Sequence, residues 1–119
     1  MTQPCILVAE DEPIIAIDLC DTVEEAGYNV LGPHRKISSA MLEFQKHKPD
    51  VAILDVQLND GVVFALAEKL ADEDVPIIFH SGHFTHEEVA KKFPGATTLQ
   101  KPCPPAKMLE AVNGVLGIA

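Results

Sequence analysis

The 119-residue sequence has few basic residues, few cysteines and no long apolar segment. Only 9 Lys and Arg residues accompany 18 Asp and Glu residues, which gives a formal net charge of −9 at pH 7. Binding to a phosphate backbone requires clustered basic side chains, so nucleic acid is not an expected partner. A cation, or a protein partner with a basic surface, suits this charge.

The shortage of long apolar runs and of cysteines also bears on location. The N-terminus Met1-Thr2-Gln3-Pro4 has no basic region, and the apolar run that follows stops after residue 9. Neither a signal peptide nor a membrane span is therefore expected. The cysteines Cys5, Cys20 and Cys103 are odd in number and have no paired spacing. We therefore expect reduced thiols and a cytoplasmic protein.

Five apolar runs divide the chain at regular intervals. They begin near residues 5, 28, 51, 76 and 96. The intervals leave room for one helix and two short loops, which is typical of repeated βα units and a parallel sheet. Helical patterns fill the gaps, over residues 13–26, 38–46, 63–70, 85–93 and 108–116. At this length the whole chain, residues 1–119, is expected to form one domain.

The polarity of the runs predicts the order of the strands. The runs at 5, 51 and 75 are continuously apolar, as expected for central strands that helices cover on both faces. The runs at 28 and 96 contain polar residues and are expected at the edges. The sequence therefore predicts an α/β fold, a flavodoxin-like (βα)5 doubly wound parallel sheet with strand order 2-1-3-4-5.

Polar side chains follow the predicted strands at the points where these end. Glu10 and Asp11 follow the first run, Asp55 follows the third, and Ser81 and Lys101 follow the fourth and fifth. The carboxyl ends of parallel strands meet at one edge of a sheet, where ligands of such folds bind. A carboxylate cluster there needs a cation, and oxygen ligands favour Mg²⁺. An Asp is also a competent nucleophile at phosphorus. Ser81 and Lys101 can supply a hydroxyl and a cation to a phosphoryl group.

At these motifs the chain resembles the receiver (CheY-like) domain of two-component response regulators, over essentially its whole length. The matching segments are Val8-Ala9-Glu10-Asp11-Glu12, Ile53-Leu54-Asp55, Ser81-Gly82 and Lys101-Pro102. The resemblance implies that Mg²⁺ is held by Glu10, Asp11, Asp55 and the backbone carbonyl of Gln57. It implies that Asp55 accepts a phosphoryl group from the phosphohistidine of a sensor kinase or phosphotransfer protein, with Ser81 and Lys101 contacting that group. The bond between Lys101 and Pro102 is expected to be cis.

Some positions depart from the family pattern. The usual switch aromatic of the last strand falls at Thr98. The segment from Phe79 to Phe84 resembles the FATGUY subgroup of stand-alone receivers, with Phe84 where that subgroup has Tyr. Gly82 is expected to leave the phosphoryl pocket open. His83 either influences access of the hydrolytic water or is an exposed loop residue.

The resemblance implies a single-domain response regulator that signals by protein contact or onward phosphotransfer, and that catalyses only its own phosphorylation and dephosphorylation. The expected contact face includes Phe84, Val89, Lys91, Lys92 and Leu99. One alternative is a degenerate receiver that acts as a constitutive binding module. Another is a small phosphatase with an aspartyl nucleophile, which would need a carboxylate where the chain has Gln57.

Three histidines raise one further possibility. His80, His83 and His86 recur at every third position. On a segment that passes from strand to loop, this spacing does not bring three imidazoles to one point. A zinc site is therefore not expected there.

Overall fold

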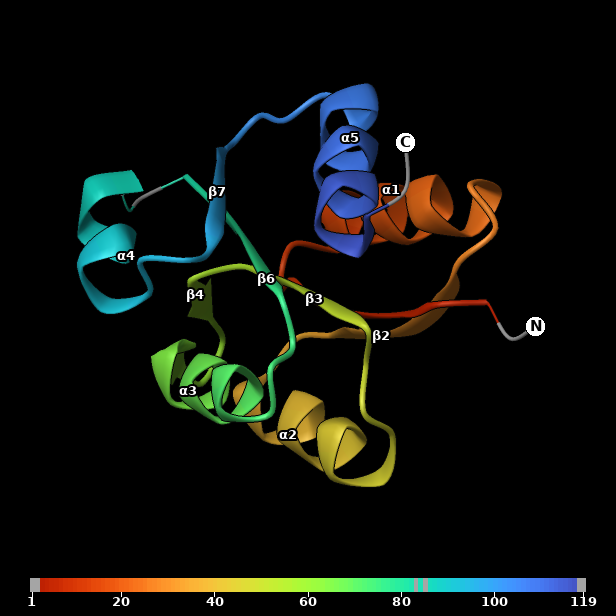
Figure 1. The fold of residues 1–119 in the computed structure, drawn as a ribbon. Helices are drawn as coiled ribbons and strands as arrows, with labels where there is room; N and C mark the ends of the chain where they lie inside the picture. The colour runs from red at the N-terminus through yellow and green to blue at the C-terminus, as the bar shows by residue number, and fades with distance from the viewer. Residues whose placement is uncertain (1–2, 83, 85, 118–119) are drawn as a thin grey trace.

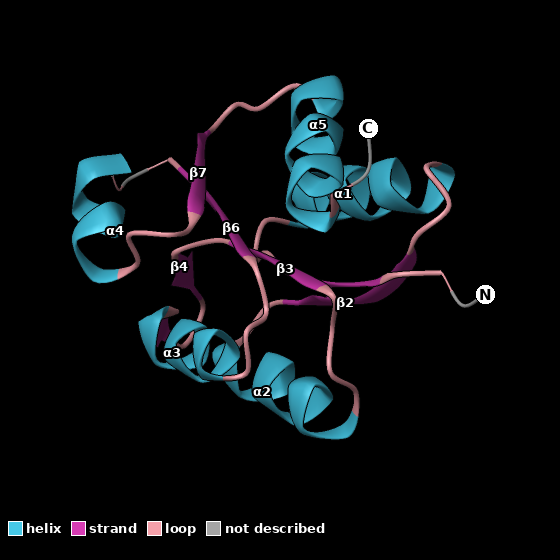
Figure 2. Ribbon diagram, in the orientation of Figure 1, coloured by secondary structure: helices cyan, strands magenta, loops and turns pink. Residues whose placement is uncertain are grey.

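The computed structural model describes residues 3–82, 84 and 86–117. Its centre is a five-stranded parallel sheet with the order β2-β1-β3-β6-β7 (Figure 2). The strands are β1 (Cys5–Ala9), β2 (Asn29–His34), β3 (Val51–Leu54), β6 (Ile77–Ser81) and β7 (Thr97–Gln100). The additional strands β4 and β5 lie outside this sheet. The predicted order 2-1-3-4-5 is therefore confirmed, with the two polar runs at the edges.

Helices cover both faces of the sheet (Figure 1). The helices α1 (Pro13–Glu25) and α5 (Pro105–Leu116) lie on one face, and α2 (Ile37–Lys46) and α3 (Phe64–Asp72) lie on the other. The short helix α4 (His86–Lys92) lies beside β7. No helix in the described part of the chain combines the length and the apolar character needed to cross a bilayer.

The ends of the helices follow from local chemistry. Pro13 and Pro105 stand at the starts of α1 and α5, where a missing backbone N–H costs no hydrogen bond. Gly117 ends α5 with φ of 75°, a left-handed conformation that glycine adopts without a steric penalty. Thr85, where the predicted helix 85–93 was expected to begin, lies outside the described residues.

The segment after Asp55 contains a small antiparallel hairpin. It consists of β4 (Gln57–Leu58) and β5 (Gly61–Val62). Asp60, in its turn, accepts hydrogen bonds from the backbone N–H groups of Ile37 (2.6 Å) and Ser38 (3.2 Å). These bonds lower the pKa of Asp60 and satisfy two backbone donors of the first turn of α2. The hairpin therefore joins the segment after Asp55 to the start of a helix.

The structure corrects the expected contact face at Val89. This side chain is fully buried in the core between the sheet and the helices α2, α3 and α4. The helix α4 has only seven residues, and Val89 is its one buried residue, so it attaches the helix to the core. Val89 cannot belong to a surface that a partner touches. Lys91 is exposed, whereas the Nζ of Lys92 lies 5.6 Å from the centre of the Phe64 ring.

Candidate functional site

The register of the sheet places three polar residues in one row. Ala9 pairs with Leu54, and Leu54 pairs with Phe79. Glu10, Asp55 and His80 are the next residues along these three strands. Because side chains alternate between faces, all three lie on the α1/α5 side, opposite to the residues that precede them. Asp55 is also held at its backbone, since its N–H donates to the carbonyl of Ala9 (2.8 Å).

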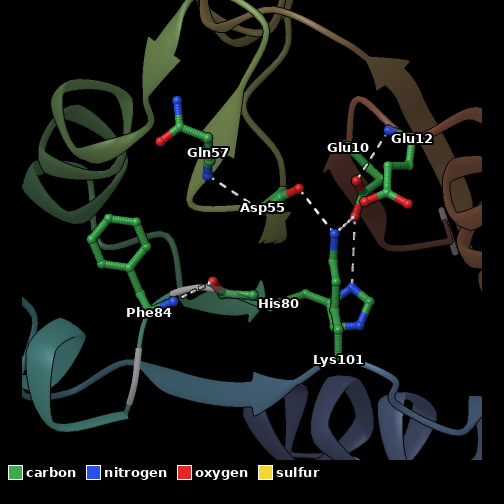
Figure 3. A network of polar contacts seen from close by, with 8 residues as sticks. Glu10, Glu12, Asp55, Gln57, His80, Phe84 and Lys101 are labelled. Carbon is green, nitrogen blue, oxygen red and sulfur yellow. Dashed lines mark hydrogen bonds and ion pairs between the residues drawn. The ribbon is translucent and has the colours of Figure 1, made fainter.

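Lys101 joins two of these residues across the site. Its Nζ lies 2.8 Å from Oε1 of Glu10 and 3.0 Å from Oδ2 of Asp55 (Figure 3). Glu10 is 1% exposed and Asp55 is 5% exposed, so one partly buried cation serves two buried carboxylates. The backbone sets this position, because the N–H of Lys101 donates to the carbonyl of Ser81 (3.0 Å). As expected, the bond between Lys101 and Pro102 is cis.

The electrostatics show that Lys101 does not fully compensate for the burial of the Glu10 carboxylate. Desolvation raises the pKa of Glu10 from 4.5 to about 7, although the hydrogen bond from Lys101 opposes this change. Burial alone would lower the pKa of Lys101, but its hydrogen bonds to Glu10 and Asp55 outweigh that effect and raise it. The buried carboxylate of Glu10 therefore favours a proton, or a further cation beside it.

The acidic cluster has the donor set of a hard-cation site. One carboxylate oxygen from each of Glu10, Asp11 and Asp55 can be chosen so that all three lie within 4.8 Å of one another. Asp11 is half-buried, at the mouth of the cluster. The N–H of Gln57 donates to Oδ1 of Asp55 (3.3 Å), which places the backbone of Gln57 beside the cluster. Oxygen donors of this kind suit Mg²⁺.

Ser81 lies beside the row, next to Gly82. Ser81 is 1% exposed, and its Oγ accepts a hydrogen bond from the N–H of Phe84 (3.1 Å). A Cβ built on Gly82 would lie 3.8 Å from Cβ and Cδ of Lys101, so this position faces the lysine. His83 lies outside the described residues.

Phe84 connects the loop after Ser81 to the core. Its ring packs edge-on against Phe64 of α3, with 6.0 Å between centroids. Its carbonyl accepts a hydrogen bond from the side chain of Gln100 (2.9 Å). Thr98 pairs with Phe79 in the sheet, and its Oγ1 is buried without a hydrogen-bond partner in the described part of the chain. Phe84 therefore contacts Phe64 and Gln100, whereas Thr98 belongs to the sheet itself.

His80 is the site residue that the sequence interpretation missed. It is 4% exposed, and its Nδ1 lies 3.8 Å from Oε1 of Glu10. Burial and then the charge of Lys101 lower the pKa of His80 to about 4, so the imidazole is neutral at pH 7. The available signal was a histidine directly after an apolar run and directly before Ser81.

Comparison with known proteins agrees with this geometry. The profile of the response regulator receiver domain matches residues 6–113, and the chain belongs to this family of two-component signalling domains. Its sequence is 32% identical, over 114 residues, to the phyllosphere-induced regulator PhyR of Methylorubrum extorquens. That match covers 93% of this chain and 43% of PhyR. The chain spans less than half the length of the curated relatives that it matches.

Solved receiver structures share the fold along almost the whole chain. The non-phosphorylated receiver domain of HemR from Leptospira biflexa has 27% identity and a TM-score of 0.86, and the match covers 98% of this chain and 97% of that one. SdrG from Sphingomonas melonis has 32% identity and a TM-score of 0.81, with 98% and 99% covered. The resemblance to the FATGUY subgroup stays a prediction.

Proposed function

We propose that this chain is the phosphoryl acceptor of a two-component phosphorelay, with Asp55 as the nucleophile. The observation that carries the proposal is the placement of Asp55 at the end of the central strand β3, in contact with Lys101 and within 4.8 Å of carboxylate oxygens of Glu10 and Asp11. A carboxylate oxygen of Asp55 attacks the phosphorus of a phosphohistidine. The P–N bond breaks, an acyl phosphate forms, and the released imidazole takes up a proton.

The residues around Asp55 fit a bound Mg²⁺. Glu10, Asp11 and Asp55 would hold it through carboxylate oxygens, and the backbone carbonyl of Gln57 is the expected fourth protein ligand. When bound, such a cation offsets negative charge on the incoming phosphoryl group. The raised pKa of Glu10 supports this assignment, because burial is its main cause and a cation beside the carboxylate would offset the cost of burying its charge.

Lys101 and Ser81 complete the acceptor. Lys101 already contacts Asp55, so its ammonium group can pair with a phosphoryl oxygen attached there. Ser81 can turn its hydroxyl toward the same group and donate a hydrogen bond. The donor of the phosphoryl group is a sensor histidine kinase or a phosphotransfer protein, and the phosphorylated chain then acts on a protein target in the cytoplasm.

Acetyl phosphate provides a direct test. With Mg²⁺ and acetyl phosphate, the chain is expected to gain one phosphoryl group, measured by intact mass. The same mixture with excess EDTA should leave the mass unchanged, because the acidic cluster then lacks its cation. If the mass stays unchanged with Mg²⁺, and histidine phosphotransfer proteins also fail to label the chain, the reading as a constitutive binding module replaces this one.

We further expect the signal to leave through the loop after Ser81. The Oγ of Ser81 accepts from the N–H of Phe84 in the resting state, and a turn of the hydroxyl toward Asp55 removes this acceptor. Phe84 would then move relative to Phe64 and Gln100. With Thr98 in the usual switch position, this path replaces a rotating aromatic in β7.

The segment from Gly82 to Phe93 should therefore show the largest amide chemical-shift changes when Mg²⁺ and beryllofluoride, a phosphoryl mimic, are added. Heteronuclear NMR measures these changes residue by residue. Residues 64–72 of α3 should change less, and the far ends of the strands should not change. Shifts confined to the residues that touch Asp55 would contradict this path.

A further inference from the structure

His80 is a buried imidazole that the proposed chemistry does not use. It ends an apolar stretch of β6, and neither of its ring nitrogens has a hydrogen-bond partner in the described part of the chain. Figure 3 shows the ring beside the Lys101 side chain, with Nδ1 toward the carboxylate of Glu10. A buried polar group without a hydrogen bond destabilises the folded state, so its presence calls for a reason beyond packing.

Lys101 has room to move in this part of the molecule. A cavity of about 520 Å³ lies between α1 and α5, and Lys101, His80 and Gly82 are among its lining residues. Leu19 and Met108 are among the apolar residues that line the rest. The side chain of Lys101 therefore has open space beside it on the side of α1 and α5.

A phosphoryl group on Asp55 changes which partner Lys101 prefers. In the resting state Lys101 divides its ammonium group between Glu10 (2.8 Å) and Asp55 (3.0 Å). The phosphoryl oxygens carry more negative charge than the carboxylate that they replace, so they attract the ammonium group away from Glu10. Glu10 is 1% exposed, and Oε1 would then lose its nearest donor in a place that water does not reach.

We propose that His80 is a positioning residue. Its Nδ1–H donates a hydrogen bond to Oε1 of Glu10 when Lys101 moves to the phosphoryl group. The separation of 3.8 Å between Nδ1 and Oε1 is slightly too long for a hydrogen bond, and a small rotation of either side chain closes it. A neutral imidazole carries one ring N–H, so the Nδ1–H tautomer donates without any change of charge. The Glu10 carboxylate is thus held in both states, by Lys101 at rest and by His80 after Lys101 has moved. This inference rests on the proposed function.

Two variants of equal size separate the donor from the packing. Asn places an amide nitrogen where His has Nδ1, whereas Leu has the same shape as Asn and no donor. The His80→Leu variant should weaken the binding of beryllofluoride, in saturating Mg²⁺, by about tenfold, because a hydrogen bond to a charged group is lost only in the mimic-bound state. The His80→Asn variant should retain most of the affinity. Mg²⁺ affinity without beryllofluoride should be the same in all three proteins, because Lys101 then still holds Glu10.

The histidine ring supplies an independent readout. In protein with ¹⁵N-labelled histidine, the Nδ1 signal of His80 should move toward a hydrogen-bonded N–H when Mg²⁺ and beryllofluoride are added, and it should not move with Mg²⁺ alone. An unchanged Nδ1 signal, or equal beryllofluoride affinity in wild type and His80→Leu, overturns the inference. So does an equal loss of affinity in His80→Leu and His80→Asn, since packing would then be the cause.

The design separates this inference from the proposed function. If the wild-type protein binds no beryllofluoride and gains no phosphoryl group, the proposed function fails. If wild type binds the mimic and the His80 variants behave like it, only the role of His80 fails. Denaturation by urea in EDTA checks that both variants are folded at the temperature of the titrations.

Discussion

In the Asp55→Asn variant, the rate of phosphorylation with acetyl phosphate is expected to fall by a factor on the order of 1000 or more. The loss of a covalent nucleophile is among the largest effects that a substitution has. Asn keeps the shape of Asp and can still accept from the N–H of Gln57. It has no carboxylate to attack phosphorus. The initial rate of labelling, followed by intact mass with Mg²⁺ and acetyl phosphate, measures the loss.

An exposed position provides the matched control. Asp72 lies at the end of α3 and is exposed, so Asp72→Asn makes the same chemical change away from the site. Its labelling rate should equal that of wild type. An acyl phosphate on the wild-type protein should also be released by hydroxylamine. Labelling that persists in Asp55→Asn, or that resists hydroxylamine, would assign the phosphoryl group to another residue.

The Glu10→Gln variant should be more stable than wild type above pH 7 in the absence of divalent cations. The pKa of Glu10 is raised in the folded state from 4.5 to about 7, mainly by burial. Folding therefore becomes less favourable as the pH rises from about 4.5 to about 7, because the folded state must give up a proton that it holds more tightly than the unfolded state. At 1.36 kcal/mol per pKa unit, the full cost at higher pH is about 3 kcal/mol.

Gln cannot ionise, so the variant avoids this cost. We expect a gain of about 2 kcal/mol at pH 8, since a neutral amide also gives up part of the interaction with Lys101. At pH 4.5 the gain should be close to zero. Urea denaturation in EDTA at both pH values measures it, with Glu68→Gln on the exposed side of α3 as the control. Equal stability of wild type and Glu10→Gln at pH 8 would contradict the raised pKa.

Much of the fold could be predicted because the apolar runs that form its strands differ in how many polar residues they contain. The runs ending at Ala9, Leu54 and Phe79 have no polar residue, and these became the central strands. The same reasoning identified Asp55 and Glu10, because a charge that follows such a run must lie where the strand leaves the core. Lys101 was found in the same way at the end of an edge strand.

Other features could not be predicted, because they depend on contacts between segments that are distant in the sequence or on patterns too short to recognise. The β4–β5 hairpin forms from segments of two residues, too short for a pattern, and Gly61 with φ of 134° makes its backbone turn possible. The burial of Val89 depends on which side of a seven-residue helix meets the core. The contact between His80 and Glu10 depends on the register of three strands at once, so no local pattern could reveal it.

The shared row of Glu10, Asp55 and His80 has a consequence for how the chain can tolerate changes in length. Inserting one residue within β1, β3 or β6 would turn the group at its end to the opposite face and dismantle the site. Insertions at the other end of the sheet, such as at residues 47–49 or 73–74, leave the carboxyl ends of the strands in register. Tolerance to insertion therefore differs along the strand axis. The loops that lead into the amino-terminal ends of the strands can vary in length, whereas the strands themselves cannot.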